Sequence, residues 1–206
     1  MRSPAFARGP VAACCAHCDT VANVEDDPTA PAPSHPAVLL DAARIARRVA
    51  ELAGEIDSAY AQLPHPLVLI CVLKGSLFFT ADLARALRIP VVIDFIAVRS
   101  YQGTRSMGTV ELVKDVGMSL NDRDVLVVED IIDSGLTTSF LLDHINSHRP
   151  RSLRLVALLD KQVERLREVH VDFTGFRIAD RFVVGYGLDV DERWRNLPDV
   201  RHLDGM

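Results

Sequence analysis

The stretch Val125–Thr138, VLVVEDIIDSGLTT, is the part of the sequence that decides the fold. An apolar run ends in two adjacent carboxylates, Glu129 and Asp130, and a polar loop then leads into a segment with the periodicity of a helix. The loop suits a phosphate, because Gly135 permits a tight turn and the first backbone N–H groups of a helix are free to donate hydrogen bonds. Three hydroxyl residues add further donors: Ser134, Thr137 and Thr138.

A helix cap alone would explain the hydroxyl residues of this loop. It would not explain Glu129 and Asp130, because two like charges at the end of a buried strand are costly without a cation or a polyol partner. The stretch therefore indicates a site for a phosphorylated ligand that also carries hydroxyl groups.

Strand and helix patterns alternate on both sides of this stretch. Short apolar runs predict strands at residues 67–73, 91–98, 109–113, 124–129, 153–159 and 181–184. Helical patterns occupy residues 41–62, 76–87 and 137–147. The polar, glycine-containing residues 99–108 predict a mobile loop. The alternation predicts an α/β fold with a parallel core sheet and flanking helices, in which ligands bind beyond the carboxyl ends of the strands.

Composition favours one globular domain and disfavours a general nucleic-acid binder. The chain has 206 residues, 49% of them hydrophobic, and about 150 residues is typical of one domain. A net charge of −5 argues against a general nucleic-acid binder, which needs clustered Lys and Arg. No apolar run reaches the length of about 18 residues that a membrane span needs. The lysines are few, so each position is informative: Lys74, Lys114 and Lys161.

Residues 1–36 are rich in Ala, Pro and Cys and show no sustained periodicity. They predict a disordered N-terminal extension before a domain at residues 37–206. The extension lacks the apolar core of a signal peptide, so secretion is not expected. Three of the four cysteines lie in it: Cys14, Cys15 and Cys18. They lack the second ligand pair of a zinc site, and Cys71 lies in an apolar run, so the cysteine usage predicts a reducing, cytoplasmic location.

Several segments resemble signatures of a known family. VVEDIIDSGLT (residues 127–137) resembles the phosphoribosyl-diphosphate signature of type I phosphoribosyltransferases. VLKGSLFF (72–79) resembles their diphosphate-binding loop, and LLDK (158–161) their purine-reading lysine segment. Ser100-Tyr101 opens a segment similar to their flexible active-site loop. FVVGYGLD (182–189), followed by Glu192, Arg193, Arg195 and Leu197, is similar to the C-terminal signature of the hypoxanthine-guanine phosphoribosyltransferases.

This resemblance implies a type I phosphoribosyltransferase fold with a small hood made from the terminal segments. It also implies the reaction: a 6-oxopurine and 5-phospho-α-D-ribose 1-diphosphate give a purine nucleotide and diphosphate, with Mg2+ as cofactor. Asp133 matches the proposed acid/base residue near purine N7, and the Lys74–Gly75 peptide can be cis in this family.

The implied binding residues fall into three groups. Phosphoribosyl diphosphate would be bound by Lys74, Gly75, Ser100, Tyr101, Glu129, Asp130, Asp133, Ser134, Gly135, Leu136, Thr137, Thr138 and Arg195. The purine would be bound by Lys161, Phe182, Val183 and Asp189. Mg2+ would be bound by Glu129, Asp130 and Asp189. Leu136 stands where related enzymes carry polar residues, so only its backbone is expected to contribute.

Two alternatives stay open beside hypoxanthine-guanine transfer. One is a 6-oxopurine transferase that prefers xanthine. The other is a non-catalytic regulator that senses phosphoribosyl diphosphate and binds RNA, which the acidic composition disfavours. The expected partners are therefore small-molecule substrates and further copies of the chain, in a homodimer or homotetramer, without nucleic acid or membrane.

The N-terminal extension provides a first test. Because residues 1–34 lack periodicity and end in a proline-rich stretch, deleting them is expected to leave both catalytic activity and melting temperature nearly unchanged. Steady-state assays and thermal unfolding of the shortened chain measure both quantities. A large loss of either would show that the extension packs on the domain.

Overall fold

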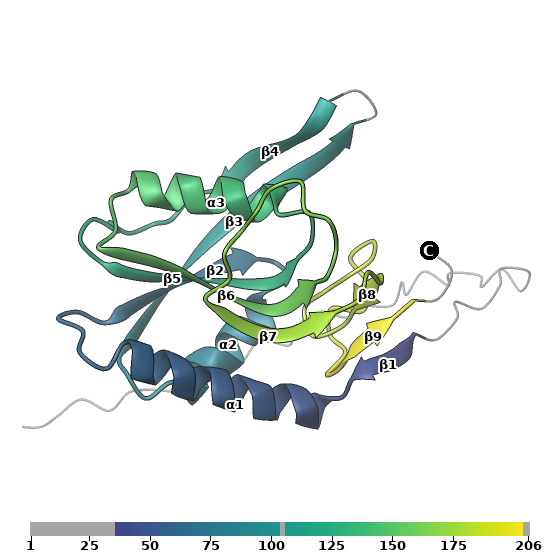
Figure 1. Ribbon diagram of the computed structural model, residues 1–206, viewed down its shortest axis with the longest axis horizontal. Coiled ribbons are helices and arrows are strands. Elements are labelled where there is room, and N and C mark those ends of the chain that lie inside the picture. The colour runs from purple at the N-terminus through teal and green to yellow at the C-terminus, as the bar shows by residue number, and fades with distance from the viewer. Residues whose placement is uncertain (1–35, 104–105, 204–206) are drawn as a thin grey trace, which may run out of the picture. The chain divides into compact units, whose positions relative to one another are not determined.

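The computed structural model describes residues 36–103 and 106–203, the side chains of residues 100–109 excepted, and it contains two β-sheets (Figure 1). The larger sheet has six strands in the order β4-β3-β2-β5-β6-β7. Its strands are β2 (Leu67–Leu73), β3 (Val91–Gly103), β4 (Ser106–Lys114), β5 (Asp124–Ile132), β6 (Ser152–Lys161) and β7 (Phe173–Ile178). All neighbours are parallel except β3 and β4, which confirms the predicted α/β fold with a parallel core sheet.

Three helices cover the two faces of this sheet: α1 (Ala42–Ala59), α2 (Leu77–Ala86) and α3 (Leu136–Ser147). Alternate residues of a strand point to opposite faces, so Leu67 and Leu69 of β2 pack in the same apolar cluster as α1 and α2. Val68 and Ile70 point the other way and pack in the cluster that contains α3. Both faces of the sheet are therefore covered, as the continuous apolar runs predict.

The start of α1 shows how the sequence determines a helix boundary. Asp41 caps the helix, because its side chain accepts a hydrogen bond from the backbone N–H of Arg44 at 2.7 Å. The buried residues follow the helical spacing seen in the sequence: Ile45, Val49, Leu52, Ala53 and Ile56. The three predicted helices are all present, and their ends agree with the predicted ends to within three residues.

The smaller sheet joins the two ends of the domain. It is formed by β1 (Ala37–Leu40), β9 (Val200–His202) and β8 (Val183–Val184), in that order and all antiparallel. This sheet is the hood that the resemblance implies. The strand predicted at residues 181–184 is shorter than expected, since only Val183 and Val184 pair. None of the helices described within residues 36–103 and 106–203 is long and apolar enough to cross a membrane.

The prediction of a loop at residues 99–108 is wrong for the backbone that the structure describes. β3 continues to Gly103, and β4 begins at Ser106 and runs back beside it, so the hairpin extends well past the other strands (Figure 1). Polar residues indicate exposure to solvent, but they do not prevent antiparallel pairing, which satisfies the backbone of an exposed hairpin. β7 was not predicted, because its sequence FTGFRI is interrupted by Gly175 and Arg177.

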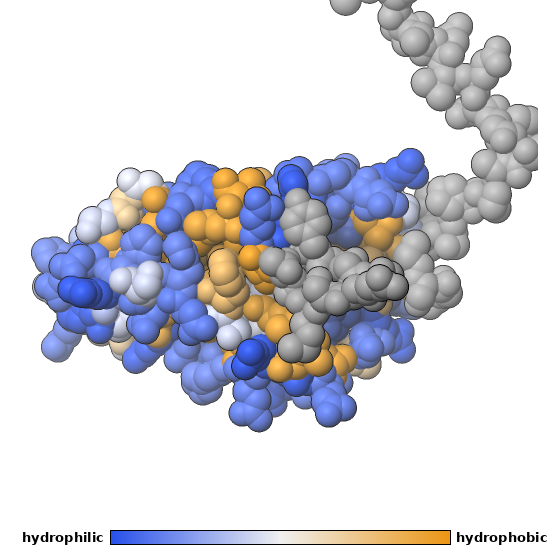
Figure 2. Space-filling view, turned by 90° about the horizontal axis from the view of Figure 1, so that it is seen from above, coloured by the Kyte–Doolittle hydropathy of each residue, from blue (hydrophilic) through white to orange (hydrophobic). Residues whose placement is uncertain are grey.

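The surface around these layers is mostly polar. Figure 2 shows hydrophilic residues over most of one face and hydrophobic residues gathered near its middle. Side chains such as Leu77, Phe78 and Ile93 are large, apolar and exposed. The predicted N-terminal extension lies outside the described residues.

Candidate functional site

A cavity of about 330 Å³ lies at the carboxyl ends of the central strands. It is lined from three sides: the segment after β2, the end of β5 with the loop into α3, and a segment of the hood. The lining includes these residues that the sequence indicates: Lys74, Gly75, Glu129, Asp130, Asp133, Ser134, Gly135, Thr137, Thr138, Asp189 and Arg195. Residues that are far apart in the chain thus line one cavity, as expected for a parallel sheet.

The end of β5 carries two adjacent carboxylates, of which Glu129 is buried and Asp130 is half-buried. Burial raises the pKa of Glu129 well above its ordinary value, and the charge of Asp130 raises it further. The Thr138 hydroxyl donates to Glu129 Oε1, but only at 3.5 Å. Burial also raises the pKa of Asp130 to about 6, although backbone hydrogen bonds and the charge of Arg195 oppose this. The negative charge of the pair is therefore poorly compensated by the protein.

These carboxylates fit a divalent metal ion. Glu129, Asp130 and Asp189 all face the cavity and offer oxygen ligands, the type that hard cations such as Mg2+ prefer. Burial raises the pKa values of both Glu129 and Asp130, so their charged forms lack compensation. A bound cation would supply it.

The loop between β5 and α3 depends on a glycine. Gly135 caps α3 with a φ of 81°, and a Cβ at this position would clash with the backbone carbonyl of Arg167. The same neighbouring segment holds the loop through Ser134, whose carbonyl accepts hydrogen bonds from the backbone N–H groups of Leu166 and Arg167 at 3.0 and 3.2 Å. Ser134, Thr137 and Thr138 line the cavity beside these backbone groups.

Close backbone contacts connect the segment after β2 to both neighbours. A Cβ on Gly75 would clash with the Asp130 carboxylate, and a Cβ on Gly187 would clash with the carbonyl of Gly75. Gly187 has a φ of 106°, a conformation that favours glycine. The cis peptide lies between Leu73 and Lys74 rather than between Lys74 and Gly75, so the expected bond is wrong by one position. The resemblance indicates the segment but does not identify the bond.

Arg195 organises the hood side of the cavity. Its guanidinium pairs with Asp189 at 2.8 Å and with Glu192 at 3.3 Å, and it donates to the carbonyl of Gly187 at 2.8 Å. Glu192 also pairs with Lys74 at 3.0 Å. The hydrogen bond from Lys74 and then that from Arg195 lower the pKa of Glu192, so this carboxylate is ionised. Glu192 is part of the C-terminal signature, but no function is predicted for it from the sequence.

Lys161 lies at the end of β6 and is held by two carboxylates. Its ammonium donates to Asp133 Oδ2 at 2.9 Å and to Asp180 Oδ1 at 3.3 Å. Burial opposes the charge, but the hydrogen bonds and charges of these two aspartates raise the pKa of Lys161 above its ordinary value. Asp180 was not predicted, because it lies outside every quoted motif and is brought close only by the fold.

Lys161 and the remaining predicted residues lie outside the lining of this cavity. Phe182 is 41% exposed and Val183 is buried in β8. Leu136 begins α3, and its side chain does not line the cavity. The backbones of Ser100 and Tyr101 pair with Val110 and Thr109 in the β3–β4 hairpin, but their side chains lie outside the described residues.

Comparison with known proteins identifies the family. The model of the phosphoribosyl transferase domain matches residues 37–191. The chain belongs to the phosphoribosyltransferase family. It is therefore a transferase, and the match includes the loop from β5 into α3 and the segment after β2.

Relatives of this chain and solved structures similar to it include hypoxanthine and hypoxanthine-guanine phosphoribosyltransferases. The hypoxanthine-guanine phosphoribosyltransferase of Mycobacterium avium is 46% identical over 86% of this chain and 92% of its own length. The enzyme of the same name from Bacillus subtilis is 46% identical over 79% of this chain and 90% of its own length. A solved structure of the hypoxanthine phosphoribosyltransferase from Trypanosoma cruzi, a mutant in a ternary substrates complex, has a TM-score of 0.75 and 40% identity, covering 81% of this chain and 94% of that chain. Membership among these enzymes implies a requirement for a divalent metal.

The ion pair between Lys74 and Glu192 generates a prediction for this phosphoribosyltransferase. Glu192 forms an ion pair with the Lys74 ammonium, which a bound diphosphate would also contact. Glu192→Gln is therefore expected to lower the KM for phosphoribosyl diphosphate by a few-fold, with kcat little changed. The effect is small because ion pairs between exposed side chains are weak. Asp191→Asn, which removes an exposed carboxylate at the preceding position, is the control and is expected to leave KM unchanged. An unchanged or higher KM in Glu192→Gln would show that Glu192 does not compete with the substrate.

Proposed function

We propose that this protein transfers the 5-phosphoribosyl group of 5-phospho-α-D-ribose 1-diphosphate to N9 of hypoxanthine or guanine, giving IMP or GMP and diphosphate in purine salvage. The names of its relatives support this reaction. The observation that carries it in this chain is Lys161, a largely buried ammonium held at 2.9 Å from Asp133 at the edge of the phosphate loop.

Each part of phosphoribosyl diphosphate has a suitable place in the cavity. The 5′-phosphate is proposed to bind the loop at residues 133–138, where backbone N–H groups at the start of α3 and three hydroxyl side chains converge. The ribose hydroxyls are proposed to reach Glu129 and Asp130, directly or through metal-bound water. Lys74, the backbone of Gly75 and Arg195 would hold the diphosphate, since they supply positive charge and a donor without a side chain in the way.

The metal is proposed to be Mg2+, held by Glu129, Asp130 and Asp189. A bound Mg2+ would stabilise the negative charge of the leaving diphosphate. Asp189 is positioned for this by its 2.8 Å ion pair with Arg195. The carboxylates of Glu129 and Asp130 lie close to the proposed ribose position, where they would stabilise positive charge that develops on the sugar as the bond to diphosphate breaks.

The base is proposed to bind beside Lys161. The ammonium can donate a hydrogen bond to the O6 atom of hypoxanthine or guanine, but it cannot accept one from the 6-amino group of adenine. Phe182, which is exposed just before β8, is proposed to stack on the purine, and the backbone of Val183 to contact its edge. Asp133 is proposed to exchange a proton with N7 of the base.

Lys161 therefore predicts which bases react. With adenine a donor faces a donor, so neither the ammonium nor the 6-amino group gains a hydrogen bond there, which can discriminate by about 10⁴-fold. We expect strong use of hypoxanthine and guanine, negligible use of adenine, and loss of 6-oxopurine efficiency in Lys161→Met, measured as kcat/KM over a purine panel. The panel also ranks xanthine against the other 6-oxopurines.

The matched control is Lys114→Met, the same substitution at a lysine whose ammonium donates to the backbone carbonyls of Phe95 and Asp115 rather than to Asp133. It is expected to keep the base preference of the parent. Comparable turnover of adenine by the parent, or an unaffected Lys161→Met variant, would refute the assignment. Tight, salt-sensitive RNA binding without turnover would instead favour the regulator.

A substitution at Asp133 distinguishes a catalytic role of this residue from a role in substrate binding. Asp133→Asn keeps the size of the side chain but removes the carboxylate, so kcat is expected to fall by about 10²-fold or more, the scale of general acid–base catalysis. Asp180→Asn is the matched control, because it removes the other carboxylate partner of Lys161 without changing the cavity lining. A change confined to the KM for phosphoribosyl diphosphate in Asp133→Asn would show that Asp133 is a binding residue.

Assembly and location stay predictions. The large apolar side chains Leu77, Phe78 and Ile93 are exposed and suit contact with further copies of the chain, in a homodimer or homotetramer. A cytoplasmic location is supported by Cys71, which is a free, buried thiol.

A further inference from the structure

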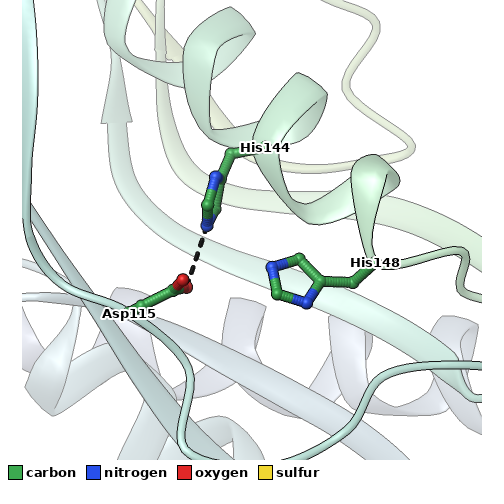
Figure 3. A group of neighbouring side chains, drawn as sticks. All are labelled: Asp115, His144 and His148. Atoms are coloured by element: carbon green, nitrogen blue, oxygen red, sulfur yellow. Dashed lines mark hydrogen bonds and ion pairs between the residues drawn. The ribbon is translucent and has the colours of Figure 1, made fainter.

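A second group of side chains with metal-binding chemistry lies outside the cavity. Asp115 follows directly after β4, His144 lies in the last turn of α3, and His148 follows that helix (Figure 3). One ligand atom from each lies within 4.8 Å of the others. None of the three lines the cavity of about 330 Å³ at the ends of the strands.

The three side chains point toward one another. Asp115 Oδ1 lies 2.9 Å from His144 Nε2. The rings of His144 and His148 meet edge to face with centroids 5.1 Å apart. Figure 3 shows a ring nitrogen of each histidine directed toward the Asp115 carboxylate. The two histidines are four residues apart, a spacing that puts both on one face of a helix end.

We propose that Asp115, His144 and His148 form a binding site for a divalent transition-metal ion of the zinc class. Two imidazole nitrogens and one carboxylate oxygen are a ligand set that suits Zn2+, Co2+ or Ni2+, whereas Mg2+ prefers oxygen ligands alone. A three-residue set leaves the fourth tetrahedral position to water. On binding, the metal would replace the hydrogen bond between Asp115 and His144.

The surroundings hold the ligands in place. Asp115 Oδ1 accepts the backbone N–H of Val116 at 2.7 Å, and the Lys114 ammonium donates to the Asp115 carbonyl at 2.9 Å. Phe140 stacks on the ring of His144 with centroids 6.4 Å apart. The ligand positions are thus ordered before any metal arrives, which reduces the entropy lost on binding.

The electrostatics also favour a cation. Partial burial opposes ionisation of Asp115, but the hydrogen bond from His144 and that from Val116 hold its pKa below the ordinary value. Asp115 is therefore a carboxylate at neutral pH. His144 and His148 lie at the C-terminal end of α3, where the helix dipole is negative and stabilises positive charge.

A metal at this cluster would connect two parts of the protein that carry the proposed active site. α3 begins at the phosphate loop and ends at the histidines, whereas Asp115 ends the β3–β4 hairpin. Binding would therefore brace the hairpin against the helix. This is a structural role, distinct from that of the metal proposed at Glu129, Asp130 and Asp189.

The test uses the untagged full-length chain with Cys14→Ser, Cys15→Ser and Cys18→Ser, because those thiols would also bind zinc. Zn2+ is titrated calorimetrically in excess Mg2+, which occupies oxygen-only sites. One equivalent is expected to bind and to raise the melting temperature, since a ligand of the folded state stabilises it. Absence of both binding and a rise in melting temperature would overturn the proposal.

Variants assign the site to its residues. His148→Gln and Asp115→Asn are each expected to weaken Zn2+ binding by at least about 100-fold, because loss of even an outer-shell partner costs about 10–100-fold. His170→Gln, at a histidine whose side chain is 87% exposed, is the control and should bind like the parent. Equal melting temperatures without metal establish that the variants fold. Unchanged Zn2+ affinity in His148→Gln would overturn the assignment.

Co2+ provides a measurement on the cysteine-substituted parent that does not depend on substitutions in the cluster. Imidazole and carboxylate ligands in tetrahedral geometry give visible absorption by the cobalt ion without the sulfur charge-transfer band of a thiolate site. That spectrum is expected. An octahedral, aqua-like spectrum at saturating Co2+ would contradict the proposal.

Discussion

Two neighbouring carboxylates at the end of a buried strand are the constraint on which the rest of the site depends. β5 lies between β2 and β6, so Glu129 is buried at the end of the sheet and its neighbour Asp130 is half-buried. Their raised pKa values express the cost of two negative charges in that position. Arg195 lines the same cavity and offsets part of this cost, and a cation or the hydroxyl groups of a sugar would offset more.

The second requirement is close approach of neighbouring groups to two glycines, Gly75 and Gly187. Gly75 lies between the Asp130 carboxylate and Gly187, and neither contact leaves room for a side chain. The hood is therefore set against the strand ends by contacts that only glycine permits, and Tyr186 strengthens the attachment by donating to Asp82 of α2 at 2.6 Å. Asp189 and Arg195 reach the cavity because the segment that carries them is fixed in this way.

The core elements could be predicted because their apolar patterns are long and regular. β2, β5 and β6 are apolar runs, and α1 shows helical spacing over its whole length. Of the hood strands, β8 was predicted two residues too long, and β1 and β9 were not predicted, since three paired residues leave no periodic pattern. β7 was missed because Gly175 interrupts it. The motif residues could be predicted because each motif is a short continuous stretch of sequence. The contact of Asp180 with Lys161 and the ion pair of Lys74 with Glu192 could not, because they join residues that are far apart in the sequence. The helical spacing of His144 and His148 is visible in the sequence, but Asp115 joins them only in three dimensions.

The pairing of β1 with β9 has a consequence for biosynthesis. Ala37 pairs with His202 and Leu40 with Val200, so the first strand of the domain has its partner in the last. A ribosome releases the chain from its N-terminus, and β1 therefore waits unpaired while the six-stranded sheet and its helices can already form. The hood closes only when residues 200–202 have emerged. Completion of the cavity consequently follows formation of the six-stranded sheet, and a nascent chain that stalls before residue 200 has a folded core without a finished site.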